Sequence, residues 1–175
     1  MTSAAAVRPL PDEYAPHYVP YVSAVPDGDI TDTLASQGEA LVARLKHLSD
    51  EQGAHAYGPG KWSVKEVICH ITDAERIFAY RMLRMGRGDS TPLASFDENA
   101  YAAASAAGDR TLDSLLGEFA AVRGATLALL RGLPDAAWAR RGTASGKEVT
   151  VRGVAWIAAG HALHHARILA ERYGV

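Results

Sequence analysis

The sequence has a single cysteine, Cys69, among its 175 residues, so no intramolecular disulfide can form. One thiol fits a reducing compartment, and we expect a cytoplasmic protein. Basic residues are not in excess: 18 Lys and Arg against 20 Asp and Glu give a formal net charge of -2, which argues against nucleic-acid binding. No apolar run approaches the roughly 20 residues of a membrane-spanning helix, and residues 1–12 lack the apolar segment of a secretory signal.

Hydrophobic residues make up 48% of the chain, which is ample for the core of one domain. Five of the eight prolines fall before residue 27: Pro9, Pro11, Pro16, Pro20 and Pro26. Proline at this density predicts an extended path rather than a helix. Three tyrosines, Tyr14, Tyr18 and Tyr21, alternate with these prolines and are costly to leave in water. We therefore expect residues 1–28 to form an extended arm laid across a domain of residues 29–175.

Four stretches carry apolar residues at helical spacing and predict four long amphipathic helices. The first extends from the N-cap Asp29 to about residue 53, and the second from Ser63 to about residue 86. The third extends from Thr111 to residues 132–134, and the fourth from about Thr150 to residue 173. Ser63 and Glu66 form a capping box, the clearest of these starts. No segment resembles a strand, so the sequence predicts an all-α four-helix bundle.

Connection lengths predict the order of the helices in this bundle. The loop between the first two helices is short, which makes them antiparallel neighbours. Residues 87–110 are numerous enough to cross the bundle from end to end, so the second and third helices can run parallel. We therefore expect an up-down-down-up bundle, with short helices at residues 96–99 or 134–140 within the connections.

Three of the seven histidines lie within five residues of the fourth predicted helix, at His161, His164 and His165. Residues four apart share a helix face, so His161 and His165 can direct their rings at a common point. His164 is rotated by about 100° and falls on the flank of that face. The inward pair is half of a metal site, or else two core histidines hydrogen-bonded to carbonyls or water.

His70, in the second predicted helix, is the natural third ligand. Its angular position is oblique to the apolar face, and Ala74 one turn later leaves room for an ion. The alternative is a boundary histidine that makes a local hydrogen bond, for example with Glu66. Three neutral imidazoles suit zinc, nickel or iron and leave coordination positions open for water or substrate.

Other polar residues near these histidines have less distinctive patterns. Three carboxylates are candidates to orient the imidazoles, although such residues are more often solvated charges: Asp73, Glu75 and Glu171. Four arginines make the end of the second helix basic, which is typical of a solvated face that complements the helix dipole: Arg76, Arg81, Arg84 and Arg87. Cys69 is expected to be a small buried hydrophobe.

Two segments together carry a resemblance to a known family. Residues 57–73 read YGPGKWSVKEVICHITD, and residues 161–169 read HALHHARIL. With these motifs the chain resembles the DinB family of metal-binding four-helix bundles, which includes YfiT-like proteins. Further likeness at residues 75–78, 96–99 and 142–146 extends the resemblance from about residue 14 to the C-terminus. The resemblance implies the metal ligands His70, His161 and His165, and so favours His70 as the third ligand.

The resemblance also implies a set of functions. Some relatives are thiol-dependent transferases, in which a metal activates a low-molecular-weight thiol such as bacillithiol, mycothiol or glutathione. We therefore expect a metal-dependent thiol S-transferase that acts on small electrophiles and forms a homodimer. The same site would also suit a hydrolase that uses metal-bound water, or a non-enzymatic metal-binding protein of the stress response.

Overall fold

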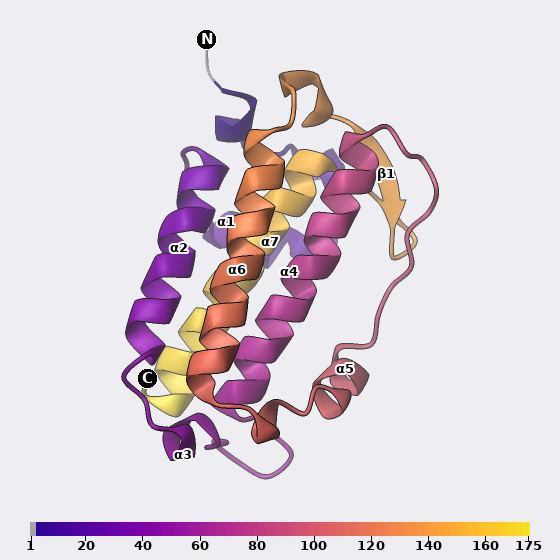
Figure 1. Ribbon diagram of the computed structural model, residues 1–175. Coiled ribbons are helices and arrows are strands. Elements are labelled where there is room, and N and C mark those ends of the chain that lie inside the picture. The colour runs from indigo at the N-terminus through magenta and orange to yellow at the C-terminus, as the bar shows by residue number, and fades with distance from the viewer. Residues whose placement is uncertain (1–2) are drawn as a thin grey trace.

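The computed structural model describes residues 3–175, which are mostly helical (Figure 1). Four long helices form the body of the molecule: α2 (Ile30–Leu45), α4 (Val64–Gly86), α6 (Leu112–Arg131) and α7 (Val151–Tyr173). Besides five 3-10 turns, the described residues also form three short α-helices and one hairpin: α1 (Val19–Ala24), α3 (Asp50–Gly53), α5 (Glu98–Ala104), β1 (Arg141–Ala144) and β2 (Lys147–Thr150). None of the helices in residues 3–175 combines the length and apolar character that a membrane span requires.

The long helices pack as a bundle in which α4 contacts α6 and α7, and α2 contacts the same two helices. In Figure 1, α4 and α6 run from the lower end to the upper end, and α2 and α7 run the opposite way. The connection from α4 to α6 carries α5 and returns the chain along one side of the bundle (Figure 1). The contact between α4 and α7 brings the residues of these two helices together in both parts of the core.

Polar side chains fix where each long helix begins. Asp29 accepts a hydrogen bond from the Thr31 amide, and Ser63 accepts one from the Glu66 amide while the Glu66 carboxylate accepts one from the Ser63 amide. Thr111 and Thr150 cap α6 and α7 in the same manner. Such caps satisfy amides that have no partner within the helix. The predicted starts of the four long helices are confirmed.

The predicted end of the first helix is wrong. α2 ends at Leu45, and a separate helix, α3, starts after Ser49. Ser49 and Gln52 form a second capping box, in which the Ser49 side chain accepts from the Gln52 amide and the Gln52 side chain accepts from the Ser49 amide. Because this capping box starts a new helix at Ser49, the two apolar stretches do not form one continuous helix.

The prediction of an entirely α-helical chain is wrong at residues 141–150, which form an antiparallel hairpin of β1 and β2. Its turn residues Ser145 and Gly146 have φ of 54° and 72°. Two consecutive residues with positive φ make a turn whose twist suits a two-residue hairpin, and a Ser-Gly pair is the signal that reveals it. Leu93 joins the hairpin by donating to the Thr143 carbonyl and accepting from the Ser145 amide.

The N-terminal segment is less extended than its prolines predict. Residues 3–28 contain three 3-10 turns and the helix α1, whereas the first two residues of the expected arm lie outside the described part. Pro20 is in the first turn of α1, where a missing N–H breaks no helical hydrogen bond. The segment packs on α7 through α1, and Val22 is buried.

This packing depends on Gly160, at which α1 and α7 approach closely. A Cβ atom at residue 160 would lie 2.2 Å from the Tyr21 carbonyl oxygen. We expect Gly160→Ala to lower the free energy of unfolding by about 1–3 kcal/mol because backbone must move to admit the methyl group. Gly117→Ala is the control: its Cβ would meet nothing within 4 Å, and it should stabilise α6 by about 0.5–1 kcal/mol. Denaturant titration measures both, and equal effects would contradict the prediction.

Two apolar clusters form the core, and they meet part-way along the bundle. The first contains α7 residues up to Ala159 and α4 residues from Ala74 onward. The second contains α4 residues from Val64 to Ile71 and, on α7, Leu169. His70, His161 and His165 therefore occupy the junction between the two clusters.

Candidate metal centre

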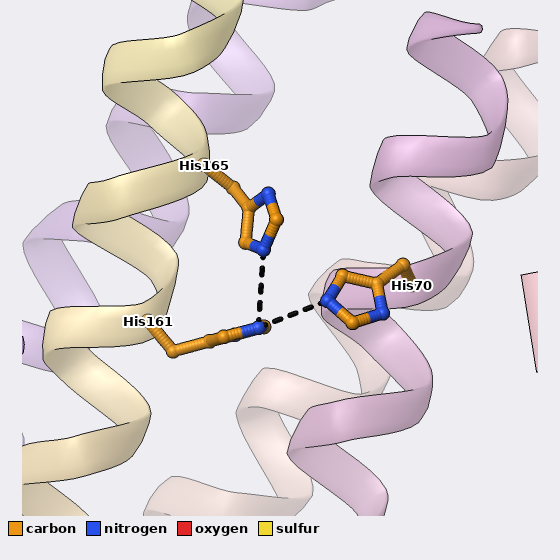
Figure 2. A group of neighbouring side chains, drawn as sticks. All are labelled: His70, His161 and His165. Atoms are coloured by element: carbon orange, nitrogen blue, oxygen red, sulfur yellow. Dashed lines mark hydrogen bonds between the residues drawn. The ribbon is translucent and has the colours of Figure 1, made fainter. Parts of the chain in front are cut away.

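Three histidine side chains from two helices converge at this junction (Figure 2). The Nε2 atom of His161 lies 3.0 Å from Nε2 of His70 and 3.2 Å from Nε2 of His165. One ring nitrogen from each residue can be chosen so that all three lie within 4.8 Å of one another. The three residues are buried, each less than one tenth exposed.

Helix packing explains why these rings meet. His161 and His165 are one turn apart on the face of α7 that contacts α4, so their side chains project in the same direction. His70 reaches them from α4, with Ala74 buried one turn later. The oblique position of His70 on its helix is thus compatible with convergence, because α4 lies directly against α7.

Burial keeps these imidazoles in the neutral form. Desolvation lowers the pKa of His70, and lowers the pKa of His165 to about 3. The pKa of His161 falls well below its usual range, first because of burial and then because of the neighbouring histidines. A neutral imidazole has a free lone pair, which is the form that binds a metal ion.

The donor atoms fit a transition-metal ion. Two nitrogens bound to one zinc ion at about 2.0–2.1 Å in tetrahedral geometry are separated by about 3.3 Å, close to the spacings from His161 Nε2. In residues 3–175 the only partners of these Nε2 atoms are one another, and no carbonyl satisfies them. Nε2 of His161 faces two other nitrogens, and one imidazole hydrogen cannot serve both contacts. A cation at their common focus would satisfy all three.

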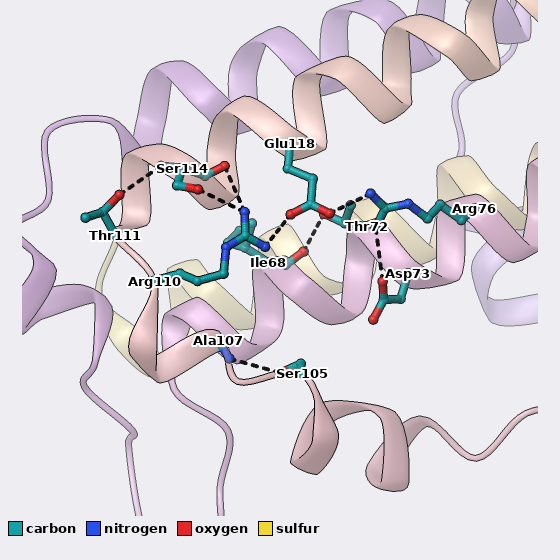
Figure 3. Close-up of polar contacts among 10 residues, drawn as sticks. All are labelled: Ile68, Thr72, Asp73, Arg76, Ser105, Ala107, Arg110, Thr111, Ser114 and Glu118. Atoms are coloured by element: carbon teal, nitrogen blue, oxygen red, sulfur yellow. Dashed lines mark hydrogen bonds and ion pairs between the residues drawn. The ribbon is translucent and has the colours of Figure 1, made fainter.

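Two of the carboxylates proposed to orient the imidazoles form ion pairs with arginines instead. Glu75 is buried and forms a two-point ion pair with Arg123, at 2.7 and 2.6 Å. Asp73 pairs with Arg76, which also binds Glu118 between α4 and α6 (Figure 3). The orienting role is therefore wrong for both residues. The partner of Asp73 lies on the same helix, whereas that of Glu75 lies on α6, 48 residues away, where its spacing from His70 gave no warning.

The remaining candidates also lie away from the ring nitrogens. Glu171 is exposed and 3.9 Å from Arg167, and Glu66 is engaged in the cap of α4. Nδ1 of His165 is buried and has no hydrogen-bond partner in the described chain. Cys69 belongs to the second apolar cluster, and burial raises the pKa of its thiol. Cys69 is thus a buried hydrophobe, as predicted, and not part of the histidine cluster.

A cavity of about 340 Å³ opens beside the three histidines. Aromatic side chains form much of its wall, from the N-terminal segment, the loop before α4, α4 itself and the chain before α5: Tyr18, Tyr21, Trp62, Phe78 and Phe96. His164 is half-buried at this wall, with its ring centroid 5.3 Å from that of Tyr21. It lies outside the three-histidine cluster, consistent with its helical phase.

Arg81 is a cavity residue that the sequence reasoning misplaced. It was expected on the solvated basic face, but it is 4% exposed and lines the cavity with Glu98 and Ser145. Arg81 follows His70 by eleven residues, which on a helix returns to within about 20° of the same direction. That angle was the available signal, and it assigns Arg81 to the histidine face of α4.

Acid should destabilise the metal-free protein through these histidines. An unfolded histidine takes up a proton near pH 6.5, whereas His165 in the folded chain does so only at about 3. Between these values the unfolded state binds more protons, so the free energy of unfolding falls as pH falls, by about 1.4 kcal/mol per pH unit per histidine. Denaturant titrations of chelator-treated protein at pH 7 to 5 measure this slope. His165→Gln should reduce the slope, and an unchanged slope would contradict the assignment.

Comparison with known proteins identifies the superfamily of this chain. The family model of the DinB superfamily matches residues 33–169. The chain belongs to the DinB superfamily. Among curated proteins, no match to this DinB-superfamily chain is found.

Two solved structures share the DinB-superfamily architecture described above. One is YfiT from Bacillus subtilis, a probable metal-dependent hydrolase with an unusual four-helix bundle topology; the TM-score is 0.73 at 22% identity, covering 83% of this chain and 86% of YfiT. The other is the mycothiol-dependent maleylpyruvate isomerase, with a TM-score of 0.65 at 17% identity. That match covers 86% of this chain but only 61% of the isomerase. At these identities the two likenesses show the fold.

Proposed function

We propose that this chain is a metal-dependent thiol S-transferase that joins a low-molecular-weight thiol to a small electrophile. The observation that carries the proposal is the convergence of three buried neutral imidazoles at the wall of a cavity large enough for a small molecule. In this proposal His70, His161 and His165 hold a zinc, nickel or iron ion. Such an ion supplies Lewis acidity, which lowers the pKa of a thiol or of water.

The chain's own residues provide the surroundings that thiol transfer needs. Trp62, Phe78 and Tyr21 line the cavity with aromatic surface, which excludes water that would compete with the thiol. The neutral imidazoles add no charge of their own beside the reacting sulfur. In the reaction a carbon–sulfur bond forms as the electrophile's bond to its leaving group breaks, and the thiol proton passes to solvent.

Each structural neighbour supports one of two reactions. The mycothiol-dependent isomerase is a thiol-dependent protein of the same fold, which favours a thiol as the reactant here. YfiT is a probable metal-dependent hydrolase, which supports a second candidate, hydrolysis by water at the same site. A DinB-superfamily protein that binds its ion without turnover, in the stress response, is the non-enzymatic alternative.

We also propose the setting in which this site works: an up-down-down-up bundle domain at residues 29–175, crossed by the segment at residues 1–28. The protein would act as a cytoplasmic homodimer on small molecules, with no nucleic-acid partner. Analytical ultracentrifugation of the purified protein tests the dimer, and a sedimentation coefficient of a monomer would exclude it.

The decisive experiment offers several nucleophiles to the same protein. Protein loaded separately with zinc, nickel or iron(II) is mixed with 1-chloro-2,4-dinitrobenzene and with glutathione, bacillithiol or mycothiol, and the thioether product is followed by absorbance. We expect formation with at least one thiol above the level of His161→Ala. Cleavage of 4-nitrophenyl acetate with water alone would favour the hydrolase. Chelation that lowers the melting temperature, with neither reaction, would favour the non-enzymatic protein.

A further inference from the structure

Arg81 lines the same cavity as the three histidines, from a position further along α4 than His70. Eleven residues at about 1.5 Å each separate its Cα from that of His70 by about 16 Å along the helix. Side chains on a helix lean toward its N-terminus, so Arg81 leans back toward the histidines. A ligand in the cavity can therefore contact the histidine cluster at one end and Arg81 at the other.

The guanidinium group of Arg81 is only partly satisfied by the protein. Its Nη2 donates to the Ala94 carbonyl and to the Ser145 hydroxyl, both at 2.9 Å. These bonds tie the hairpin turn and the chain before α5 to α4. Its Nε is buried and has no hydrogen-bond partner among residues 3–175. One edge of the guanidinium thus retains a donor that an incoming acceptor can use.

The charge of Arg81 is also uncompensated. The other buried arginine, Arg123 of α6, has the carboxylate of Glu75 as its partner, whereas Arg81 of α4 forms no ion pair in the described chain. Burial lowers the pKa of Arg81, yet guanidinium stays charged in proteins. A buried cation without an anion is costly, and an anionic ligand would relieve that cost.

We propose that Arg81 binds a carboxylate group carried by one of the two small-molecule reactants. This inference rests on the proposed function, and it names the chemical class of the ligand. A carboxylate oxygen would accept a charge-assisted hydrogen bond from the free Nε–H of Arg81, and its charge would compensate the guanidinium. Glu98, exposed at the same cavity, repels the carboxylate and limits its affinity.

Isothermal titration calorimetry of the zinc-loaded protein tests the proposal without an activity assay. The probes are acetate, succinate and glutarate, each compared with its neutral amide. We expect at least one carboxylate to bind more tightly than its amide, and Arg81→Gln to weaken that binding about tenfold or more. The proposal is overturned if no carboxylate binds better than its amide, or if Arg81→Gln binds it as the wild type does.

Two further variants control for charge and folding. Arg87→Gln removes an exposed arginine just after α4 and should leave carboxylate binding unchanged. Arg81→Lys keeps the charge but not the planar fork, so we expect intermediate affinity; wild-type affinity in this variant would count against guanidinium recognition. Arg81→Lys carries the test if the glutamine variant fails to fold, as judged by circular dichroism. Glu98→Gln should tighten carboxylate binding.

The two proposals fail in different ways. Carboxylate binding that needs Arg81, without turnover of any thiol, refutes the transferase and leaves the anion site in place. Turnover of a thiol, combined with carboxylate binding that is unchanged in Arg81→Gln, supports the transferase and refutes the anion site. In the transfer assay, competition of the bound carboxylate with the thiol or with the electrophile identifies which reactant carries the group.

Discussion

Replacing His161 with alanine should abolish stoichiometric metal binding. His161 is the central member of the cluster, because its Nε2 lies within 3.2 Å of Nε2 of both other histidines. Loss of a residue that only orients a ligand already costs about 10–100-fold in metal affinity, so removing a ligand should weaken binding at least about a hundredfold. Elemental analysis after reconstitution and dialysis gives the metal-to-protein ratio. Calorimetric titration gives the affinity.

His164→Ala is the matched control for this experiment. It removes an imidazole from the same turn of α7, but its ring is half-buried and lies outside the cluster. The control should retain a full complement of metal, although it loses the ring contacts of His164 with Tyr21 and His165. Equal loss of metal in the two variants, or full occupancy in His161→Ala, would refute the proposed ligand set.

Glu75→Gln should lower the free energy of unfolding by about 3–5 kcal/mol. Glu75 and Arg123 are 3% exposed and face each other between α4 and α6 with two hydrogen bonds. Arg123 also donates to the Leu34 carbonyl of α2, so the pair connects three helices of the bundle. The glutamine is nearly the same size as glutamate, and the expected cost arises because the charge of Arg123 is left buried without a counter-charge. Urea denaturation measures it.

An exposed ion pair in the same pair of helices is the control. Arg76→Gln removes the contact of Arg76 with Glu118 near the surface, and it should cost less than about 1 kcal/mol. Replacing the buried pair together, as Glu75→Leu with Arg123→Met, should recover most of the stability that Glu75→Gln loses. A similar cost for the buried and the exposed change would show that burial does not set the energy of this pair.

The sequence predicts this fold well where information is local. Ser63, Thr111 and Thr150 determine helix starts through bonds that span three residues, so reading the sequence finds them. The i, i+4 spacing likewise brings His161 and His165 together on one face of a helix. The convergence of these two residues with His70 depends on helix packing. From the residues alone, His70 was either the third ligand or a boundary histidine with a local hydrogen bond.

Misplaced features depend on contacts between distant segments. Glu75 follows His70 by five residues on α4, but its partner Arg123 lies 48 residues further along the chain and was not visible from spacing. The arginines at the end of α4 differ in their surroundings. Arg81 is buried because it shares the angular position of His70 on the helix, which the neighbouring arginines do not. The hairpin at residues 141–150 was overlooked for a different reason: its strands are four residues long, too short for a strand period to show.

The cavity wall formed by Tyr18 and Tyr21 has a consequence for how this protein can diverge from its relatives. Both tyrosines lie before residue 33, outside the portion that matches the superfamily model, whereas the three histidines lie within it. Under the proposed function, one part of the wall that a reactant would meet and the histidines that would hold the ion are thus encoded in separate stretches of the gene. Exchange of the N-terminal stretch between relatives would replace that part of the wall in a single crossover and leave the three histidines in place.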